Sequence, residues 1–70
     1  MSSWTSLNSS NLRKVRHDPE TRTLHVQFSN GAVHKYADVP VEEFSALLDA
    51  NSHGSYFHNY IKNNYRHERA

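Results

Sequence analysis

The feature that most constrains the fold is a short run in which apolar and polar side chains alternate. Residues 23–28 place every second side chain on the same face of a strand, which is typical of a strand with one buried face. Ser29-Asn30-Gly31 follows as a hairpin loop, and residues 32–38 form the returning strand. The pattern predicts an antiparallel hairpin, whose first strand would bury Leu24, Val26 and Phe28 and expose His25 and Gln27.

Two registers are possible for this hairpin. A two-residue turn would pair Val26 with Lys35 and bury a lysine beside a valine, which costs desolvation energy. A three-residue loop with Gly31 in a left-handed conformation would pair Val26 with His34 instead. We predict the second register, because it leaves Lys35 in water, places Tyr36 over the core and surrounds His34 with apolar neighbours.

A further strand is expected before the hairpin, within residues 9–18, where Leu12 and Val15 are apolar. Asp18-Pro19 indicates a turn, since Asp can accept hydrogen bonds from amides ahead of it and Pro fixes its own φ. Residues 1–8 are rich in serine, and we predict a flexible lead-in there. Trp4, within the lead-in, would either fold back onto the domain or stay exposed.

After the hairpin the apolar period changes to that of a helix. Pro40 suits a first helical turn, while the residue before a proline disfavours the helical conformation. The helix should end near Ala50, because residues 51–54 are a stop signal in which Gly54 can adopt a positive φ. One face of this helix carries an apolar stripe formed by Val41, Phe44, Leu47 and Leu48.

A second helix is expected after Ser55, which is a favoured N-cap residue. Phe57 and Ile61 would form its apolar seam, and tyrosines would border that seam. Residues 67–70 would be a tail. The sequence therefore predicts an α+β domain over residues 9–66, with a three-stranded antiparallel meander followed by two short helices packed on one face of the sheet.

The composition excludes several classes of protein. The 70-residue chain has no cysteine, so a disulfide framework and a thiolate metal site are ruled out. No apolar run approaches the ~20 residues that a membrane span needs, and no signal peptide is recognisable, so we expect a cytoplasmic protein without a membrane partner. The six histidines form no helical i, i+4 pair, and two glycines make no phosphate loop. We expect no metal, no cofactor and no enzymatic activity.

The formal net charge of +1 hides an uneven distribution, with basic ends and an acidic middle. If the two ends meet in the fold, they form one positive face that can attract phosphates. Basic and aromatic residues interleave, as binding of a single strand requires. The simpler interpretation is that the tyrosines seal a small core while the cations are solvated. The candidate nucleic-acid-binding residues are Arg13, Lys14, Arg16, Tyr56, Tyr60, Lys62, Tyr65 and Arg66.

Several short motifs, in a fixed order over residues 9–66, resemble the KTSC domain, a small family named from a lysyl-tRNA synthetase C-terminal extension. They are the opening Ser9-Ser10-Asn11-Leu12, the turn Asp18-Pro19, the pair Val39-Pro40 and a helical end around Gly54. The chain departs from the family pattern at His17, where an aromatic residue is common, and at His34, where the first tyrosine of a Tyr-x-Tyr motif stands. The family-motif positions are His34, Tyr36, Pro40, Gly54 and Phe57.

The resemblance implies a small α+β domain that occurs alone or as an appendage, and RNA binding has been suggested for the family. We therefore predict weak binding of single-stranded RNA or another single-stranded nucleic acid. The alternative is a protein–protein interaction module, an adaptor or inhibitor that binds a host protein. It would use an exposed strand edge, Trp4 or the aromatic second helix. Two-fold pairing through edge strands is a further possibility that the sequence leaves open.

Overall fold

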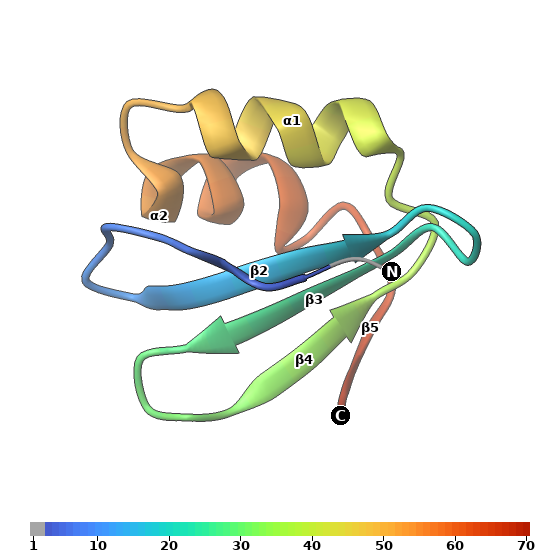
Figure 1. The fold of residues 1–70 in the computed structure, drawn as a ribbon, viewed down its shortest axis with the longest axis horizontal. Coiled ribbons are helices and arrows are strands. Elements are labelled where there is room, and N and C mark those ends of the chain that lie inside the picture. Colours follow the sequence, from blue (N-terminus) through green and yellow to red (C-terminus); the bar gives the residue numbers. More distant parts are fainter. Residues whose placement is uncertain (1–2) are drawn as a thin grey trace.

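The computed structural model describes residues 3–70 and contains one antiparallel sheet, in the strand order β1-β2-β3-β4-β5 (Figure 1). Two helical segments lie on one face of this sheet: α1 (Val41–Asp49), and α2 (His53–Tyr56) continued by the π-helical turn η1 (Phe57–Ile61). The predicted α+β class, with an antiparallel sheet and two helices, is confirmed. The strands are β1 (Thr5–Ser6), β2 (Leu12–Asp18), β3 (Thr23–Phe28), β4 (Val33–Tyr36) and β5 (His67–Arg69).

The prediction of three strands was wrong, because the sheet has five. β1 lies in the predicted lead-in, of which residues 1–2 are outside the described residues, and pairs with β2 through Thr5 and Val15. β5 lies in the predicted tail and pairs with β4 through His67 and Tyr36. All residues of β1 and β5 are exposed, so these strands are held by backbone pairing and carry no alternating apolar signal.

The β3–β4 hairpin has the predicted register. Val26 pairs with His34 and Leu24 with Tyr36. Gly31 has a φ of +92°, the left-handed conformation that favours glycine in a three-residue loop. This register decides which side chains of the two strands face the helices and which face away from them.

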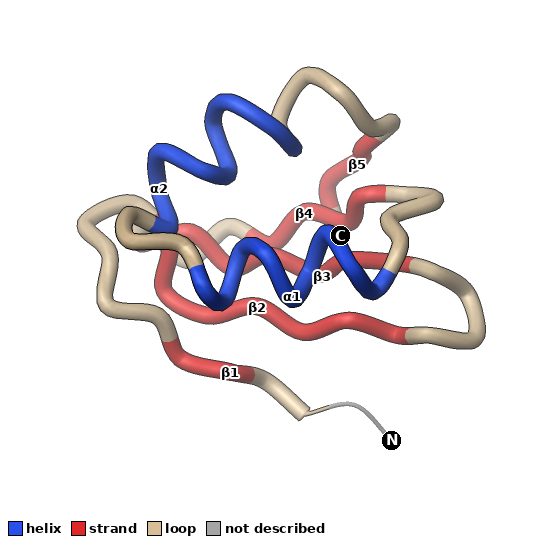
Figure 2. Tube along the Cα trace, turned by 90° about the horizontal axis from the view of Figure 1, so that it is seen from above, coloured by secondary structure: helices blue, strands red, loops and turns tan. Residues whose placement is uncertain are grey.

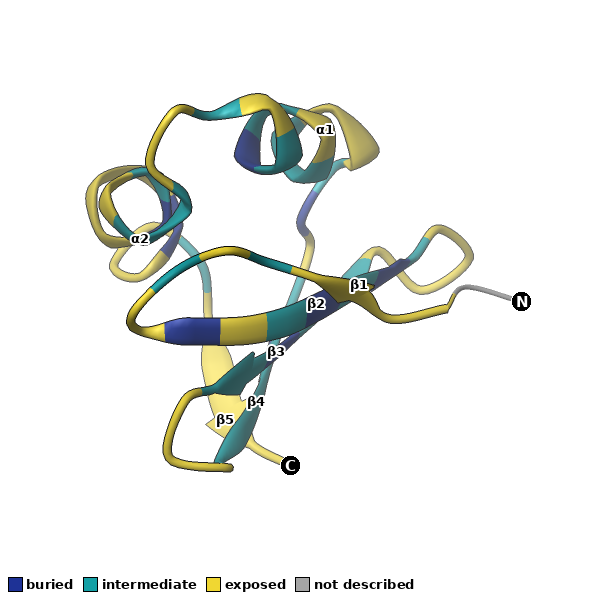
Figure 3. Ribbon diagram, turned by 60° about the vertical axis from the view of Figure 1, so that its left-hand side comes forward, coloured by how far each residue is buried: buried dark blue, intermediate teal, exposed yellow. Residues whose placement is uncertain are grey.

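The sheet has one covered face and one uncovered face (Figure 3). We call the side under the helices the inner face and the opposite side the outer face. Alternate residues of β3 and β4 point inward, as period-two geometry requires. On β2 the bulge between Leu12 and Lys14 interrupts the alternation, so that Leu12 and Val15 are both buried. The inner face and the helices bury nine apolar side chains: Leu12, Val15, Leu24, Val26, Tyr36, Val39, Leu47, Phe57 and Ile61.

The first helix begins directly after Pro40, as predicted, and ends at Asp49 with Ala50 as its C-cap, where an end near Ala50 was predicted. It runs above β2 and β3, while α2 begins at the end of the sheet where α1 stops (Figure 2). Leu47 is buried in the core, but Val41, which was predicted to share its stripe, is 50% exposed. Six residues at 3.6 residues per turn place Val41 about 120° around the helix from Leu47, outside the buried sector.

The second helix begins earlier than predicted. Ser52, and not Ser55, is the N-cap, since the Ser55 amide donates a hydrogen bond of 3.3 Å to the Ser52 hydroxyl. Gly54 therefore lies inside α2 and does not adopt the positive φ expected of a stop signal. A Cβ at this position would lie 3.3 Å from the Ser9 hydroxyl oxygen, so a larger residue would require Ser9 to move by a few tenths of an ångström. The predicted seam of Phe57 and Ile61 is buried.

Candidate nucleic-acid interface

A row of charged and polar side chains crosses the outer face of the sheet. Arg16 on β2 pairs with His25 on β3, His25 pairs with Lys35 on β4, and Lys35 pairs with Glu68 on β5. Partial burial lowers the pKa of His25 below its usual value, and the cations Arg16 and Lys35 on either side lower it further, against a smaller opposing effect of the Asp18 carboxylate. The centre of the outer face is therefore a positive environment.

Trp4 folds back onto this face, which is one of the two alternatives that the sequence left open. The Lys14 ammonium nitrogen lies 4.9 Å from the centre of the indole ring, and the Arg16 guanidinium carbon lies 5.5 Å from it. The His25 ring meets the indole edge-on at 6.3 Å. Trp4 is still 37% exposed. Strand β1 sets this position, because its pairing with β2 brings the neighbouring Thr5 opposite Val15.

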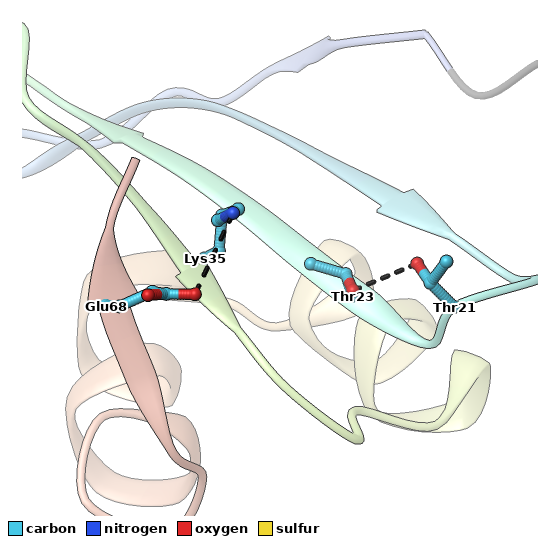
Figure 4. A network of polar contacts seen from close by, with 4 residues as sticks. All are labelled: Thr21, Thr23, Lys35 and Glu68. Atoms are coloured by element: carbon cyan, nitrogen blue, oxygen red, sulfur yellow. Dashed lines mark hydrogen bonds and ion pairs between the residues drawn. The ribbon is translucent and has the colours of Figure 1, made fainter.

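Positive charge continues toward the other edge of the sheet. Lys35 forms an ion pair of 3.8 Å with Glu68 across β4 and β5 (Figure 4). Arg66 lines a hollow of about 470 Å³ together with Lys35 and Thr23. Because both partners of the ion pair are exposed, it contributes only about 0–1 kcal/mol and leaves Lys35 available to another anion. We define the outer cationic face as Lys14, Arg16, Lys35 and Arg66, with the rings of Trp4 and His25.

The two tyrosines nearest to α1 are used for packing. The hydroxyls of Tyr56 and Tyr65 both donate hydrogen bonds to the Glu43 carboxylate, the latter over 2.8 Å. The hydrogen bond to Glu43, followed by burial, raises the pKa of Tyr56 to about 12. Burial and its hydrogen bond to Glu43 also raise the pKa of Tyr65. The Tyr60 ring lies 4.6 Å from the Tyr56 ring, tilted by 38° to it, and Tyr60 is 53% exposed. The carboxylate thus joins α1 to the second helix and its following loop.

The predicted binding residues therefore separate into groups. Arg13 sits at a bulge in β2 and donates a hydrogen bond of 3.5 Å to the Ser29 carbonyl. Lys62 lines a groove on the helix side of the sheet. Three predicted cations share the outer face. Three further members of it were not among the predicted nucleic-acid-binding residues: His25, Lys35 and Trp4. The last of these was predicted only as an anchor for a protein partner. The three predicted cations are Lys14, Arg16 and Arg66.

The hairpin register contained the missing signal, since it places His25 opposite Lys35 on the face away from the core. The hypothesis that the two basic ends meet directly was wrong, because β1 and β5 form opposite edges of the sheet (Figures 1 and 2). The central strands lie between the two basic ends, and Lys35 on β4 extends the positive charge toward Arg66.

The two positions at which histidine replaces an aromatic residue are both packed. His17 is buried, stacks on Phe44 at 5.5 Å and places Nε2 2.7 Å from the Val39 carbonyl oxygen. His34 meets the Phe28 ring edge-on at 5.3 Å. Nδ1 of each histidine is buried without a hydrogen-bond partner. Imidazole thus keeps the ring contacts at these positions, with one ring nitrogen left unsatisfied in each case.

The other family-motif positions also act in packing. Tyr36 and Phe57 meet edge-on at 5.4 Å between the sheet and η1, and Pro40 is the N-cap of α1. Within residues 3–70, no three histidine, aspartate or glutamate side chains converge as metal ligands. The helices of this described part of the chain are too short or too polar to cross a bilayer.

These features define a small α+β domain with an uncovered sheet face. Residues 8–65 match the KTSC domain, so the chain belongs to the KTSC domain family. The crystal structure of a KTSC domain protein from Yersinia pestis is similar to this fold with a TM-score of 0.92 and 25% identity, covering 100% of this chain and 99% of that one. The resemblance inferred from the sequence is confirmed.

Relatives of two kinds match the chain. An uncharacterized protein of Stutzerimonas stutzeri is 46% identical over 81% of this chain and 80% of its own length. A lysine–tRNA ligase of Nostoc is 35% identical over 83% of this chain, which spans only 10% of the ligase. The domain therefore occurs both as most of a small protein and as a small part of a large enzyme.

Proposed function

We propose that this domain is a non-enzymatic module that binds single-stranded nucleic acid through the outer cationic face. RNA is the nucleic acid that we expect it to bind. The observation that carries the proposal is the position of the partly exposed Trp4 ring, whose centre lies 4.9 Å from the Lys14 ammonium and 5.5 Å from the Arg16 guanidinium. This ring lies on a face that no helix of residues 3–70 covers (Figure 3). Proteins that bind single strands combine cations for the phosphates with rings for the bases.

The magnitudes favour weak binding. A base stacked on an aromatic ring contributes about 1–3 kcal/mol, and each phosphate contact adds an electrostatic contribution that salt reduces. The outer cationic face offers one indole and four cations, one of which is paired with Glu68. We expect a dissociation constant within the ~10⁻⁴–10⁻⁶ M typical of non-specific binding. The name of the Nostoc relative, a lysine–tRNA ligase, supports RNA as the first ligand to test.

The test is a titration of labelled single-stranded RNA, followed by fluorescence anisotropy at several salt concentrations. In Lys14→Gln/Arg16→Gln, the slope of log K against log salt should become shallower by about 1.4, because each lost phosphate contact on a single strand removes about 0.7. Arg13→Gln is the matched control, since Arg13 neighbours Lys14 but contacts the Ser29 carbonyl. Absence of binding at low salt, or equal weakening by Arg13→Gln, would overturn the proposal.

A protein-interaction module ranks second. The sheet edges that a partner strand would extend are β1, with two residues, and β5, with three, so strand addition would form few backbone hydrogen bonds. Tyr56 and Tyr65, which could anchor a partner, already donate hydrogen bonds to Glu43. Trp4 would serve either partner, so Trp4→Ala does not separate the two proposals, whereas the salt dependence does.

A further inference from the structure

A second hollow lies on the helix side of the sheet, away from the outer cationic face. It has a volume of about 430 Å³ and opens between the β3–β4 hairpin, β5 and the α2–η1 segment. Ligand pockets commonly have volumes of ~300–1,000 Å³, so the hollow is large enough for a small organic ligand. None of Trp4, Lys14 and Arg16 lines it. We call it the inner groove and define it by Tyr36, Phe57, His58, Lys62 and His67.

The walls of the inner groove are aromatic. Phe57 meets Tyr36 edge-on at 5.4 Å, and His67 stacks on Tyr36 at 4.9 Å with an angle of 27° between the rings. His67 also stacks on His34 at 5.9 Å, and it is exposed, so the ring stack continues from the core to the surface. Tyr36 and Phe57 are almost fully buried and form the floor of the groove. The rings that a ligand can reach are therefore the exposed His67 and the half-buried Phe28 and His34. Flat accessible rings favour a flat ligand that stacks against them.

The residues that line the groove also favour a negatively charged ligand. None of its lining residues, all within the described part of the chain, is an aspartate or glutamate, whereas Lys62 provides a cation at its border. His58 and His67 add imidazole nitrogens that can donate hydrogen bonds. An anionic group would therefore find donors and a positive charge here, with no carboxylate to repel it.

The backbone of η1 is consistent with a binding role. The Lys62 amide donates to the Phe57 carbonyl over 2.9 Å, which is the i to i+5 bond of a π-helical turn. Such turns are rare and occur frequently at functional sites. This turn connects Phe57, which lies against the core, with Lys62 at the groove border.

We propose that the inner groove binds a nucleoside monophosphate unit, with its base against the accessible rings of Phe28, His34 and His67 and its phosphate on Lys62 and His58. A flat aromatic ring joined to an anion is the chemistry that satisfies both the walls and the charge of the groove. The unit is either a free nucleotide or one nucleotide of an RNA strand.

The proposal does not depend on the outer cationic face, because none of the four cations of that face lines the groove. His67 lines both the groove and the hollow beside Arg66, so Phe57, His58 and Lys62 are the residues that distinguish the two sites.

The test is an NMR titration of the whole chain with AMP, UMP, adenosine, inorganic phosphate and a short single-stranded RNA. AMP or UMP should shift the backbone resonances of Phe57, His58, Lys62 and His67 in a saturable way. Adenosine or phosphate alone should bind about tenfold more weakly, since each lacks interactions of the order of 1.4 kcal/mol. No saturable shift with either nucleotide, or shifts confined to Lys14 and Arg16, would overturn the proposal.

Variants make the test specific. Lys62→Gln should weaken AMP binding about three- to tenfold while leaving adenosine binding unchanged, because a charged hydrogen bond to the phosphate is lost. Arg22→Gln, which removes the same charge at the turn between β2 and β3, outside both sites, should leave AMP binding unchanged. Equal AMP affinities of Lys62→Gln and the unsubstituted protein would refute the phosphate position. If His58→Gln also left the AMP affinity unchanged, the anion site as a whole would be refuted.

The titration with RNA shows whether the bound nucleotide is free or part of an RNA strand. If RNA shifts the groove residues at lower concentration than AMP does, a nucleotide of a strand is the ligand. If AMP shifts them and RNA does not, the ligand is a free nucleotide, and the groove proposal stands whether or not RNA binds the outer face. If RNA shifts only the outer face and AMP shifts nothing, the groove proposal fails while the proposed function stands.

Discussion

The two faces of the sheet are built from alternate residues of the same strands, yet they are specified by different physics. On β4, Tyr36 points inward and is 2% exposed, while its neighbour Lys35 points outward and pairs with Glu68. The inner face needs apolar volume and a fitted shape, so most of its members are recognisable by residue type. The outer face is defined by which side chains the register brings side by side.

This difference teaches where to look for function. Arg16 and Lys35 flank His25 on the outer face, and the same charges that would attract a phosphate disfavour protonation of His25. Like charges near one another do not help the sheet to fold. The inner face explains the stability of the domain, whereas the positive charge of the outer face is not required by packing, and this makes it the better candidate for binding.

The largest expected effect sharpens the contrast within β4. Tyr36→Ala should lower the free energy of unfolding by about 3 kcal/mol or more, because it removes a buried ring in contact with Phe57 and His67. Lys35→Ala, one residue away, should change it by about 1 kcal/mol or less, since it removes only an exposed ion pair. Chemical denaturation followed by circular dichroism measures both. Equal unfolding midpoints would contradict the assignment of the two faces.

A smaller loss of stability is expected from a substitution in the helices that cover the inner face. Glu43→Ala should cost about 1.5 kcal/mol or more, because the hydroxyls of Tyr56 and Tyr65 lose a charged acceptor. Glu42→Ala, in the same helical turn but exposed, is the matched control and should change stability little. Denaturation midpoints compare the two variants. If Glu42→Ala were as destabilising as Glu43→Ala, loss of negative charge at the helix start, rather than the tyrosine contacts, would be the cause.

The hydrogen bond between Tyr56 and Glu43 also predicts that the domain loses stability at high pH. The pKa of Tyr56 is raised to about 12 from 10.0 by the fold, so the stabilisation is fully present below pH 10 and is lost as the pH rises toward 12. In Glu43→Ala the phenol should ionise nearer to its usual pKa, because the largest cause of the shift is absent. Ultraviolet absorbance of tyrosinate during an alkaline titration follows this, and an unchanged profile in the variant would contradict the assignment.

The sequence was sufficient for the parts of the fold that apolar periodicity or turn chemistry encodes. The hairpin register followed from the cost of burying Lys35, and the start of α1 followed from Pro40. The edge strands carry no such signal, because every residue of β1 and β5 is exposed. The contacts of Glu43 span 13 residues to Tyr56 and 22 to Tyr65, so no local pattern could indicate that these tyrosines act in packing.

The candidate site shows the same division. Lys14 and Arg16 were recognised from local charge, but the position of Trp4 beside them depends on β1, which the sequence did not reveal. Interleaved basic and aromatic residues near the C-terminus looked like the stronger signal. In the fold, however, Lys62 borders a groove on the inner side, so closeness in sequence was a poor guide to a shared surface.

The smallest expected effect concerns the charge of the outer face directly. Arg16→Gln should raise the pKa of His25, while leaving it below its usual value, because burial is the largest cause of the shift and Arg16 is the next. An NMR titration of the His25 ring measures this, and Arg13→Gln, which removes the same charge at the β2 bulge, should leave it unchanged. An unchanged His25 pKa in Arg16→Gln would mean that the charged side chains across the outer face do not act as one positive surface.

The sign of the linked stability change follows from the same pKa. The folded state lowers the pKa of His25, so the unfolded chain takes up the proton first and stability falls as the pH drops from the unfolded pKa through the folded one. Arg16→Gln brings the two pKa values closer together, so the variant should lose less stability than the unsubstituted protein over that acid interval. A variant that lost as much or more over that interval would show that Arg16 does not lower the pKa of His25.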